Sequence, residues 1–200
     1  MSKENRCIII YTEGETDEQF YRELLKYYGT CTDKYTPIYQ KVIIKCLRGF
    51  GNFKFKVPRK FEKEIAQKFP DLEHHVFLAY DTDVFQFKSK PPINWQQVEK
   101  SLYTKGAFKV YHIKAEKMIE DWFLDDLDGL CTFLKIPIPP KLKGTNGLKK
   151  IGSLFKQSNK NYEKGYYTTH KFIPHLDLSL IQRKRSEVLK LLRDCMYKEK

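Results

Sequence analysis

The sequence predicts an α/β fold in which helices flank a mostly parallel sheet. Four short apolar runs, rich in β-branched residues, alternate with segments of helical periodicity, which is the pattern of successive βαβ units. The 200 residues are 41% hydrophobic and 14% aromatic. This composition suffices for one sizeable core and differs from that of a disordered chain.

Each predicted strand is short and apolar. The first, residues 7–11, reads Cys-Ile-Ile-Ile-Tyr, and such an uninterrupted run is typical of a strand that is buried on both faces. The next three strands are predicted at residues 39–47, 76–80 and 108–113.

Three helices are predicted beside these strands. Residues 18–28 follow a turn in which Thr16 or Asp17 can act as the N-cap. A basic amphipathic segment contains a proline, so its helix is predicted to start there and to cover residues 58–69. A third helix is predicted at residues 95–103.

The composition changes after about residue 135, where three prolines and a Gly- and Lys-rich stretch interrupt the pattern. We therefore predict a core of residues 1–135 and a basic, mainly helical extension of residues 136–200 that packs on it as a cap. The extension is predicted to hold a short helix at 152–157, an irregular segment at 162–174 and a terminal helix at 178–197.

The chain is basic, with a formal net charge of +12. Such an excess of Lys and Arg favours a polyanionic partner, most often nucleic acid. Phe50, Phe53 and Phe55 lie among the basic residues of one segment, a mixture that suits phosphate contacts and base stacking. The alternative is a helix with its aromatic residues in the core and its lysines in water. The predicted nucleic-acid contacts are Lys54, Lys56, Arg59, Lys60 and Lys149.

The five cysteines include no CxxC pair, and their number is odd. Free thiols in a reducing compartment fit this pattern best. No stretch approaches the roughly 20 apolar residues of a membrane span. We therefore expect a cytoplasmic protein without a membrane partner.

Acidic residues follow three of the predicted strands. Glu13 and Asp17 come after the first strand, Asp81 and Asp83 after the third, and Glu120 after the fourth. The carboxyl ends of parallel strands meet at one edge of a sheet, so these side chains are expected to converge. Clustered carboxylates repel one another, and a divalent cation removes that cost. Oxygen-only ligands point to Mg²⁺ or Mn²⁺.

Three motifs contain these acids. Residues 8–17 combine an apolar strand, a Glu-Gly pair and an acid four residues after the Glu. Residues 77–83 form an apolar strand that ends in Asp-x-Asp, and residues 118–123 contain a later acidic motif. All three resemble motifs of the Toprim family, in particular the stand-alone Toprim proteins related to the overcoming-lysogenization-defect nucleases of antiphage defence.

The resemblance implies a Rossmann-like Toprim fold and a two-metal nuclease that acts on RNA, including tRNA, or on DNA. Glu13, Asp17 and Asp81 would hold one Mg²⁺, and Asp83 and Glu120 would lean toward a second. Glu13, Asp81 and Asp83 are the acids on which catalysis would depend. A lysine beyond the core would assist at the phosphate, with Lys164 preferred over the other candidates, which are Lys143, Lys149 and Lys171.

A second hypothesis is a catalytically idle Toprim module that binds nucleic acid or a partner ATPase. Met118 stands where the family pattern often has a serine, and this favours the idle module slightly. The intact Glu13 and Asp-x-Asp acids favour the nuclease. The substrate, the trigger and the oligomeric state stay open, and a homo-oligomer is among the alternatives.

Overall fold

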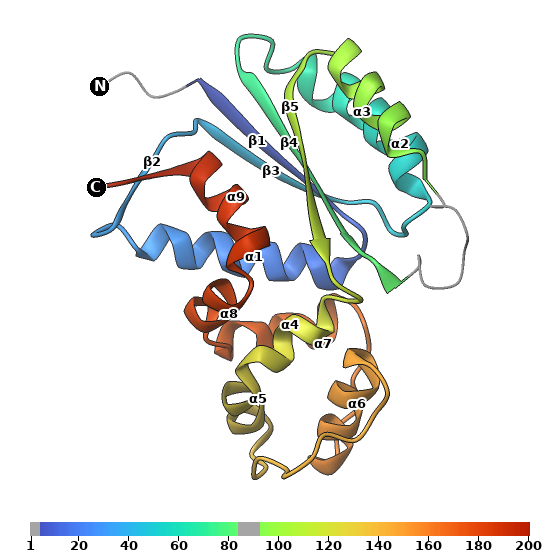
Figure 1. The fold of residues 1–200 in the computed structure, drawn as a ribbon, viewed down its shortest axis with the longest axis vertical. Helices are drawn as coiled ribbons and strands as arrows, with labels where there is room; N and C mark the ends of the chain where they lie inside the picture. The colour runs from blue at the N-terminus through green and yellow to red at the C-terminus, as the bar shows by residue number, and fades with distance from the viewer. Residues whose placement is uncertain (1–4, 84–92) are drawn as a thin grey trace.

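A four-stranded parallel sheet forms the centre of the molecule (Figure 1). The computed structural model describes residues 5–83 and 93–200. The strand order is β3-β1-β4-β5, and all three neighbouring pairs are parallel. The predicted α/β class with a parallel sheet flanked by helices is therefore confirmed. The strands are β1 (Arg6–Thr12), β3 (Lys41–Cys46), β4 (Glu73–Asp81) and β5 (Ala107–Ala115).

Helices cover both faces of this sheet (Figure 1). On one face lies α1 (Glu15–Thr30), together with the C-terminal helices. On the other face lie α2 (Asn52–Phe61), which continues into a π-helical turn (Glu62–Ala66), and α3 (Trp95–Thr104). The sheet is thus the middle of three layers.

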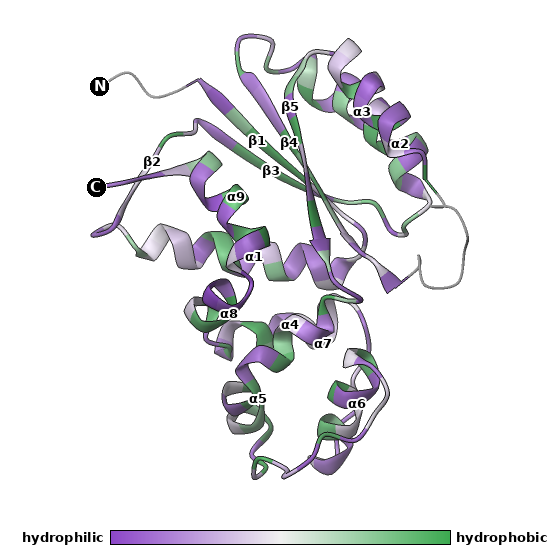
Figure 2. Ribbon diagram, in the orientation of Figure 1, coloured by the Kyte–Doolittle hydropathy of each residue, from purple (hydrophilic) through white to green (hydrophobic). Residues whose placement is uncertain are grey.

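Alternation along β1 shows why both faces are covered. Ile8 and Ile10 belong to the core on the α1 side, whereas Cys7, Ile9 and Tyr11 belong to the core on the α2–α3 side. Successive side chains of a strand point to opposite faces, so an unbroken apolar run needs a layer on each side. Apolar residues accordingly run along the strands in Figure 2.

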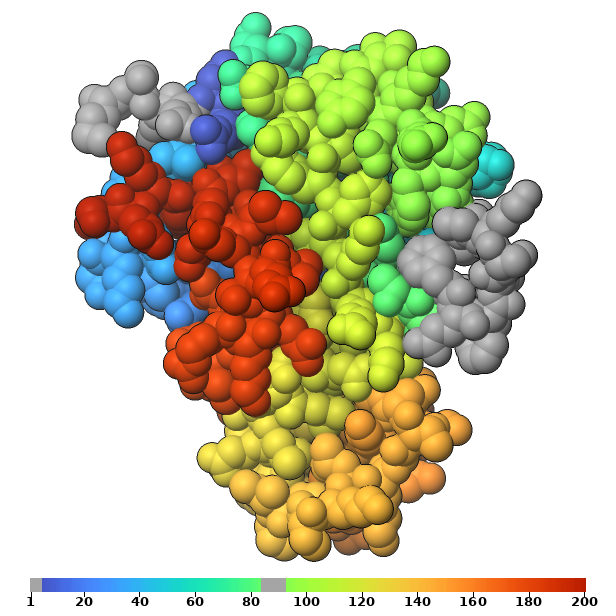
Figure 3. Space-filling view, in the orientation of Figure 1, coloured from blue at the N-terminus to red at the C-terminus, as the bar shows by residue number. Residues whose placement is uncertain are grey.

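The region after β5 is mainly helical and packs on the α1 face of the sheet, where its C-terminal part lies beside β5 (Figure 3). Ile10 and Phe20 belong to the same core as Phe172 and Leu189. The boundary at residue 135 between the core region and the extension stays a prediction. The helices are α4 (Glu120–Phe123), α5 (Leu127–Leu134), α6 (Gly147–Gln157), α7 (Tyr166–Phe172), α8 (Leu178–Lys184) and α9 (Ser186–Met196), with 3₁₀ turns at Leu124–Asp126 and Ile173–His175.

A small second sheet joins the end of the chain to the core. β2 (Tyr35–Pro37) pairs antiparallel with β6 (Tyr197–Glu199). Tyr197, at the start of β6, packs its ring against Tyr28 and Tyr39 with centroid distances of 5.6 Å. The predicted terminal helix at 178–197 therefore ends in a strand.

Two predicted helix starts are wrong. Pro58 lies inside α2, which already begins at Asn52. Phe53, Val57 and Phe61 recur every fourth residue and are fully buried, and this burial offsets the backbone hydrogen bond that proline cannot donate. At α1 the N-cap is Gly14 rather than a threonine or aspartate.

Two predictions in the extension are also wrong. The segment predicted as irregular contains α7, and the predicted terminal helix is two helices that meet at Arg185. Arg185 donates from Nε and Nη2 to the carboxylate of Asp125 at 2.6 and 3.1 Å. This contact with a distant segment holds the chain where one helix ends and the next begins.

Cys7 and Cys131 are buried and form no disulfide, whereas Cys31 and Cys46 are half-buried thiols. Burial raises the pKa of the Cys7 thiol to about 11, so it stays protonated. Among the residues that the structure describes, no helix combines the length and the apolar character that crossing a membrane requires.

Candidate functional site

A polar cavity of about 330 Å³ lies at the carboxyl edge of the sheet. Four of the predicted site residues line it: Glu13 after β1, Asp17 in α1, Asp81 at the end of β4, and Lys164 from the extension. We call it the carboxylate cavity. Its lining comprises Glu13, Gly14, Glu15, Thr16, Asp17, Arg48, Gly49, Asp81, Lys164 and Gly165.

The turn between β1 and α1 positions the first two acids. The amide of Gly14 donates to Oδ2 of Asp17 at 3.1 Å, and Oγ1 of Thr12 donates to the carbonyl of Gly14 at 3.2 Å. A Cβ at residue 14 would lie 3.2 Å from Oδ2 of Asp17, which is tight for that contact. Glycine therefore lets the chain turn closely around the Asp17 carboxylate, which is buried.

Backbone contacts beyond β4 bring the later acidic motif to Asp81. Oδ1 of Asp81 accepts from the amide of Ile119 at 2.9 Å. The amide of Asp83 donates to the carbonyl of Lys117 at 2.9 Å. Residues 117–119 are thus tied to the end of β4, and Glu120 follows directly with its side chain fully buried.

Lys164 connects these acids electrostatically. Its Nζ lies 3.2 Å from Oε1 of Glu120 and 3.9 Å from Oδ2 of Asp81. The hydroxyl of Tyr162 also donates to Oε1 of Glu120 at 3.2 Å. The lysine side chain remains 45% exposed, so it reaches the acids from the solvent side.

Gly165 anchors the segment that carries Lys164. Its amide donates to Oγ1 of Thr16 at 2.9 Å, which ties the segment to the first turn of α1. Its backbone has φ 121° and ψ 178°, a region essentially restricted to glycine. The lysine therefore depends on a glycine for its position beside the acids.

The carboxylates are poorly solvated. Desolvation by burial and the neighbouring charges of Glu13 and Glu120 raise the pKa of Asp17 to about 7. Desolvation and Asp17 raise the pKa of Asp81 to about 9, against the lowering effect of Lys164. Desolvation also raises the pKa of Glu13. Ionising this group of acids together is therefore costly unless a cation compensates them.

The fit to a divalent cation rests on unsatisfied oxygens. Oε2 of Glu13 and Oε2 of Glu120 are buried, and neither has a hydrogen-bond partner among the described residues. Such atoms are rare unless a ligand completes them. In residues 5–83 and 93–200, no three His, Cys, Asp or Glu side chains stand arranged to hold a metal ion. Asp81 and Glu120 instead lie beside the Lys164 ammonium, so a metal would need the acids to move toward one another.

Asp83 is half-buried and does not line the carboxylate cavity, although its charge contributes to the raised pKa of Glu13. Asp121, next to Glu120, lies against α6, where a Cβ on Gly147 would meet its backbone and carboxylate within 2.9 Å. Of the two neighbouring acids, only Glu120 contacts Lys164.

The predicted nucleic-acid contacts separate into three places. Lys54 and Arg59 line a groove between α2 and α3. Lys56 and Lys60 line a different cavity, of about 410 Å³, on the β3 side of α2. Lys149 is exposed on α6 and lines neither the groove nor this cavity. The other candidate lysines, Lys143 and Lys171, are also exposed and do not line the carboxylate cavity.

Sequence reasoning missed three contributors to the site. Arg48 and Gly49 line the cavity from the loop after β3, and the amide of Gly49 donates to the carbonyl of Glu13 at 2.9 Å. Tyr162 holds Glu120. The Arg-Gly pair directly after a strand was a usable signal, since strand ends carry sites in such sheets. A lone tyrosine 42 residues from its partner gave none.

Comparisons with protein-family models, with curated proteins and with solved structures found no match.

Proposed function

We propose that this protein hydrolyses phosphodiester bonds of a nucleic acid with the help of Mg²⁺ or Mn²⁺ at the carboxylate cavity. One observation carries the proposal: acids from separate strand ends converge there, desolvated, with a lysine among them. Structural ion pairs are normally made by one acid and one cation, whereas this group has an excess of buried carboxylates. The net charge of +12 supports a polyanionic substrate.

Each charged residue at the cavity has a proposed role. Glu13, Asp17 and Asp81 would hold the cation, with Glu120 beside them and Asp83 at the margin. The cation, when bound, supplies positive charge at the phosphate and lowers the pKa of a bound water. Lys164 offers a second positive charge from the solvent side, where a phosphate oxygen enters. The Ile119 amide holds Oδ1 of Asp81, and its Oδ2 lies 3.9 Å from the Lys164 ammonium.

One observation favours the rival function, a catalytically idle module that binds nucleic acid. Lys164 already contacts Glu120 and Asp81, so an internal cation partly neutralises the cluster. A purely structural cluster of this kind would need no metal. The rival predicts nucleic-acid binding without cleavage under any metal condition.

The test is a cleavage assay with tRNA, single-stranded DNA and duplex DNA in Mg²⁺, in Mn²⁺ and in EDTA. Wild type and Glu187→Gln, a substitution on the exposed face of α9, should cleave at least one substrate in a metal-dependent way. Glu13→Gln should not. Cleavage that survives Glu13→Gln at the normal rate would contradict the proposal, and binding without cleavage would favour the rival.

The motif resemblance adds a proposed biological setting, an effector of antiphage defence that works beside a partner ATPase. A plaque assay in cells that express the wild type or Asp81→Asn tests it. Protection by the wild type and loss of protection in the variant would support this setting. Equal plaque numbers with and without the gene, with and without a co-expressed candidate ATPase, would contradict it.

A further inference from the structure

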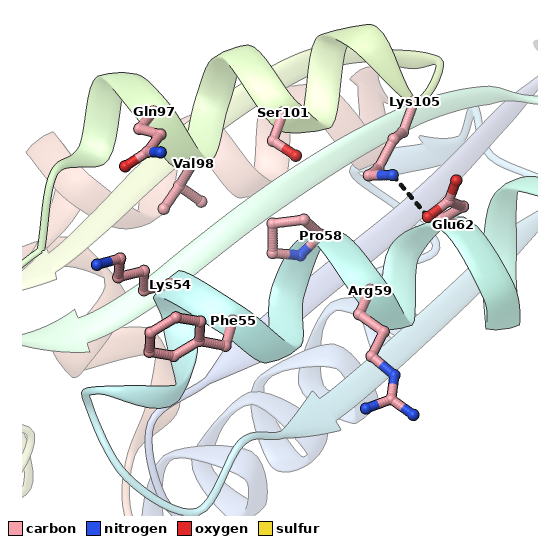
Figure 4. A pocket seen from close by; sticks show the side chains of 9 residues that line it. All are labelled: Lys54, Phe55, Pro58, Arg59, Glu62, Gln97, Val98, Ser101 and Lys105. Atoms are coloured by element: carbon pink, nitrogen blue, oxygen red, sulfur yellow. Dashed lines mark hydrogen bonds and ion pairs between the residues drawn. The ribbon is translucent and has the colours of Figure 1, made fainter.

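A groove of about 350 Å³ runs between α2 and α3, on the sheet face opposite α1 (Figure 4). Each wall is a helical face, because its residues recur every fourth position. In Figure 4 the two helices run side by side, with Lys54 and Gln97 at one end of the groove and Glu62 and Lys105 at the other. The walls include Lys54, Pro58 and Glu62 on one side and Gln97, Ser101 and Lys105 on the other.

The floor and walls of this α2–α3 groove are firmly held. Val98 is buried and lies between the helices. Trp95, at the start of α3, stacks on Tyr80 of β4 with a centroid distance of 4.4 Å and contacts the ring of Phe53 at 5.5 Å. The aromatic residues behind the groove therefore fix both helices on the sheet, and the groove is preformed.

Phe55 differs from the other phenylalanines of its segment. Phe50 and Phe53 are buried, as the structural alternative for this segment predicts, whereas Phe55 is 69% exposed. Its ring lines the groove beside Lys54, whose Nζ lies 5.0 Å from the ring centroid. A ring that already accepts a cation on its face offers a flat apolar surface to another planar group.

The charges around Phe55 are arranged for an anion. Lys105 is paired with Glu62 at 2.6 Å, and this is the only carboxylate in the groove lining. Lys54 and Arg59 have no carboxylate partner in the described part of the chain. Gln97 and Ser101 add neutral hydrogen-bonding groups on the opposite wall. One exposed ring, two free cations and neutral polar groups together match a nucleotide.

We propose that the α2–α3 groove binds an unpaired nucleotide of a single-stranded nucleic acid, with the base stacked on Phe55 and the flanking phosphates on Lys54 and Arg59. Stacking on an aromatic ring requires a base that is free of its partner strand, so the groove selects single-stranded segments or loops. Neither the ring nor the cations distinguish ribose from deoxyribose.

Residues that line the groove follow closely in the sequence on residues that line the carboxylate cavity. Gly49 lines that cavity, and α2 begins three residues later at Asn52, whose Nδ2 donates to the carbonyl of Arg48 at 2.9 Å. Lys54 and Phe55 lie in the first turn of the helix. A strand anchored on Phe55 therefore enters the groove at the end nearer to the acids. Only the identity of this strand as a substrate rests on the proposed nuclease function.

Fluorescence anisotropy with a labelled ten-nucleotide strand, in EDTA to prevent cleavage, tests the site. RNA and DNA strands of the same sequence are used, each with a duplex form and an abasic form. Phe55→Ala should weaken binding of the single strand by roughly tenfold, the scale of one base stacked on one ring. Phe55→Trp should bind like the wild type. Abasic and duplex forms should bind the wild type and Phe55→Ala equally.

Matched controls separate the site from general effects. Phe108→Ala removes another exposed phenylalanine, 58% exposed on β5, and should leave binding unchanged. Arg59→Gln should weaken single-strand binding and reduce the salt slope by about one, the signature of one lost phosphate contact. Arg183→Gln, on the exposed side of α8, should do neither. Unchanged urea midpoints would show that all variants fold.

Equal binding of wild type and Phe55→Ala to both RNA and DNA single strands would overturn the proposal. So would an equal loss on the abasic strand, because no base is present there to stack. A loss on RNA, on DNA or on both supports it, and a loss on one alone would mean that groups other than the ring and the cations recognise the sugar. Because no metal is needed, these results stand even if cleavage is never found. Conversely, cleavage lost in Glu13→Gln and full binding by Phe55→Ala would refute the groove alone.

Discussion

The carboxylate cavity and the α2–α3 groove lie at neighbouring parts of the sheet, but the cavity has buried acidic residues and the groove has exposed basic ones. The cavity has buried acids in its lining, so that Asp17 and Asp81 are each 6% exposed. The groove leaves Lys54 and Arg59 in solvent, where they retain their hydration. Buried like charges are unstable without a counter-ion, whereas exposed charges cost little.

This difference indicates what each region is suited to do. A desolvated cluster gains most from a small, dense cation, because the electrostatic interaction is strong where water is excluded. A solvated basic groove gains from a flexible polyanion that releases counter-ions on binding. We therefore propose that chemistry takes place in the first region and substrate docking in the second. The predictions that follow test this division, beginning with the largest effect.

Asp81→Asn should separate stability from activity. The substitution removes a carboxyl group whose ionisation the fold disfavours, so the free energy of unfolding in EDTA should rise or stay level. Cleavage should fall by on the order of a thousandfold, the scale of losing one electrostatic contact in an active site. Urea unfolding and initial cleavage rates measure the two effects. A variant that loses both stability and activity in parallel would point to a structural acid.

The stability of the metal-free protein should decrease as pH rises. The pKa of an Asp in the unfolded chain is about 3.9. In the fold, the pKa of Asp17 is about 7 and that of Asp81 is about 9. Both groups hold protons more tightly when folded, so their stabilising effect is complete below about pH 4 and is lost as pH passes through 7 and 9.

Urea unfolding at pH 5, 7 and 9 in EDTA measures this effect as the difference between wild type and Asp81→Asn. The wild type should lose more stability than the variant over this range. Saturating Mg²⁺ should restore much of the loss at pH 9. Parallel stability curves for the two proteins would mean that the Asp81 carboxylate is not desolvated in solution.

Gly165→Ala should destabilise the protein by about 1–3 kcal/mol, because an alanine is strained at φ 121° and ψ 178°. Cleavage should also fall, since this segment positions Lys164. Gly152→Ala is the matched control: its Cβ meets nothing within 4 Å in the middle of α6. That control should gain up to about 1 kcal/mol from helix propensity. Thermal unfolding of both variants checks the pair, and equal shifts would refute the strained backbone.

Lys164→Met should lower the free energy of unfolding in EDTA by about 1–2 kcal/mol, because Glu120 loses its positive partner. The value for a fully buried pair is larger, and it is reduced here because the lysine is 45% exposed. Lys171→Met, on the exposed side of α7, should change nothing measurable. A Lys164→Met protein that is as stable as the wild type in EDTA would mean that Lys164 does not compensate the acids.

The comparison of the two regions also shows how far the sequence could predict them. Glu13, Asp17 and Asp81 were predictable because buried parallel strands can be recognised as apolar runs in the sequence, and these acids follow such runs. Their convergence then comes from sheet geometry alone. Glu120 was predicted from the same pattern, although four residues separate it from the end of β5.

The groove was predictable only in part. The sequence places Phe53 and Phe55 in one basic segment, but the burial of one and the exposure of the other depend on the helix phase. Pro58 suggested a helix start, and that interpretation left the phase of the preceding residues undefined. The wall formed by α3 is a tertiary contact between segments about 40 residues apart, which no local pattern contains.

The sequence alone does not predict how Lys164 and Tyr162 are positioned at the site. Lys164 was preferred among four lysines, and the structure places it beside the acids, but its position depends on the Thr16–Gly165 hydrogen bond across 149 residues. Tyr162 lay in a segment predicted to be irregular. Contacts of this range follow from how the extension packs on α1.

Calorimetric titration of Mn²⁺ and Mg²⁺ into the wild type, Asp81→Asn and the surface control Glu187→Gln tests the metal-holding carboxylate cavity most directly. We expect saturable binding to the wild type and to the control, and at least tenfold weaker binding to Asp81→Asn, the scale of one lost ligand charge. Equal binding to all three proteins, or no binding to the wild type, would contradict a metal site at these acids.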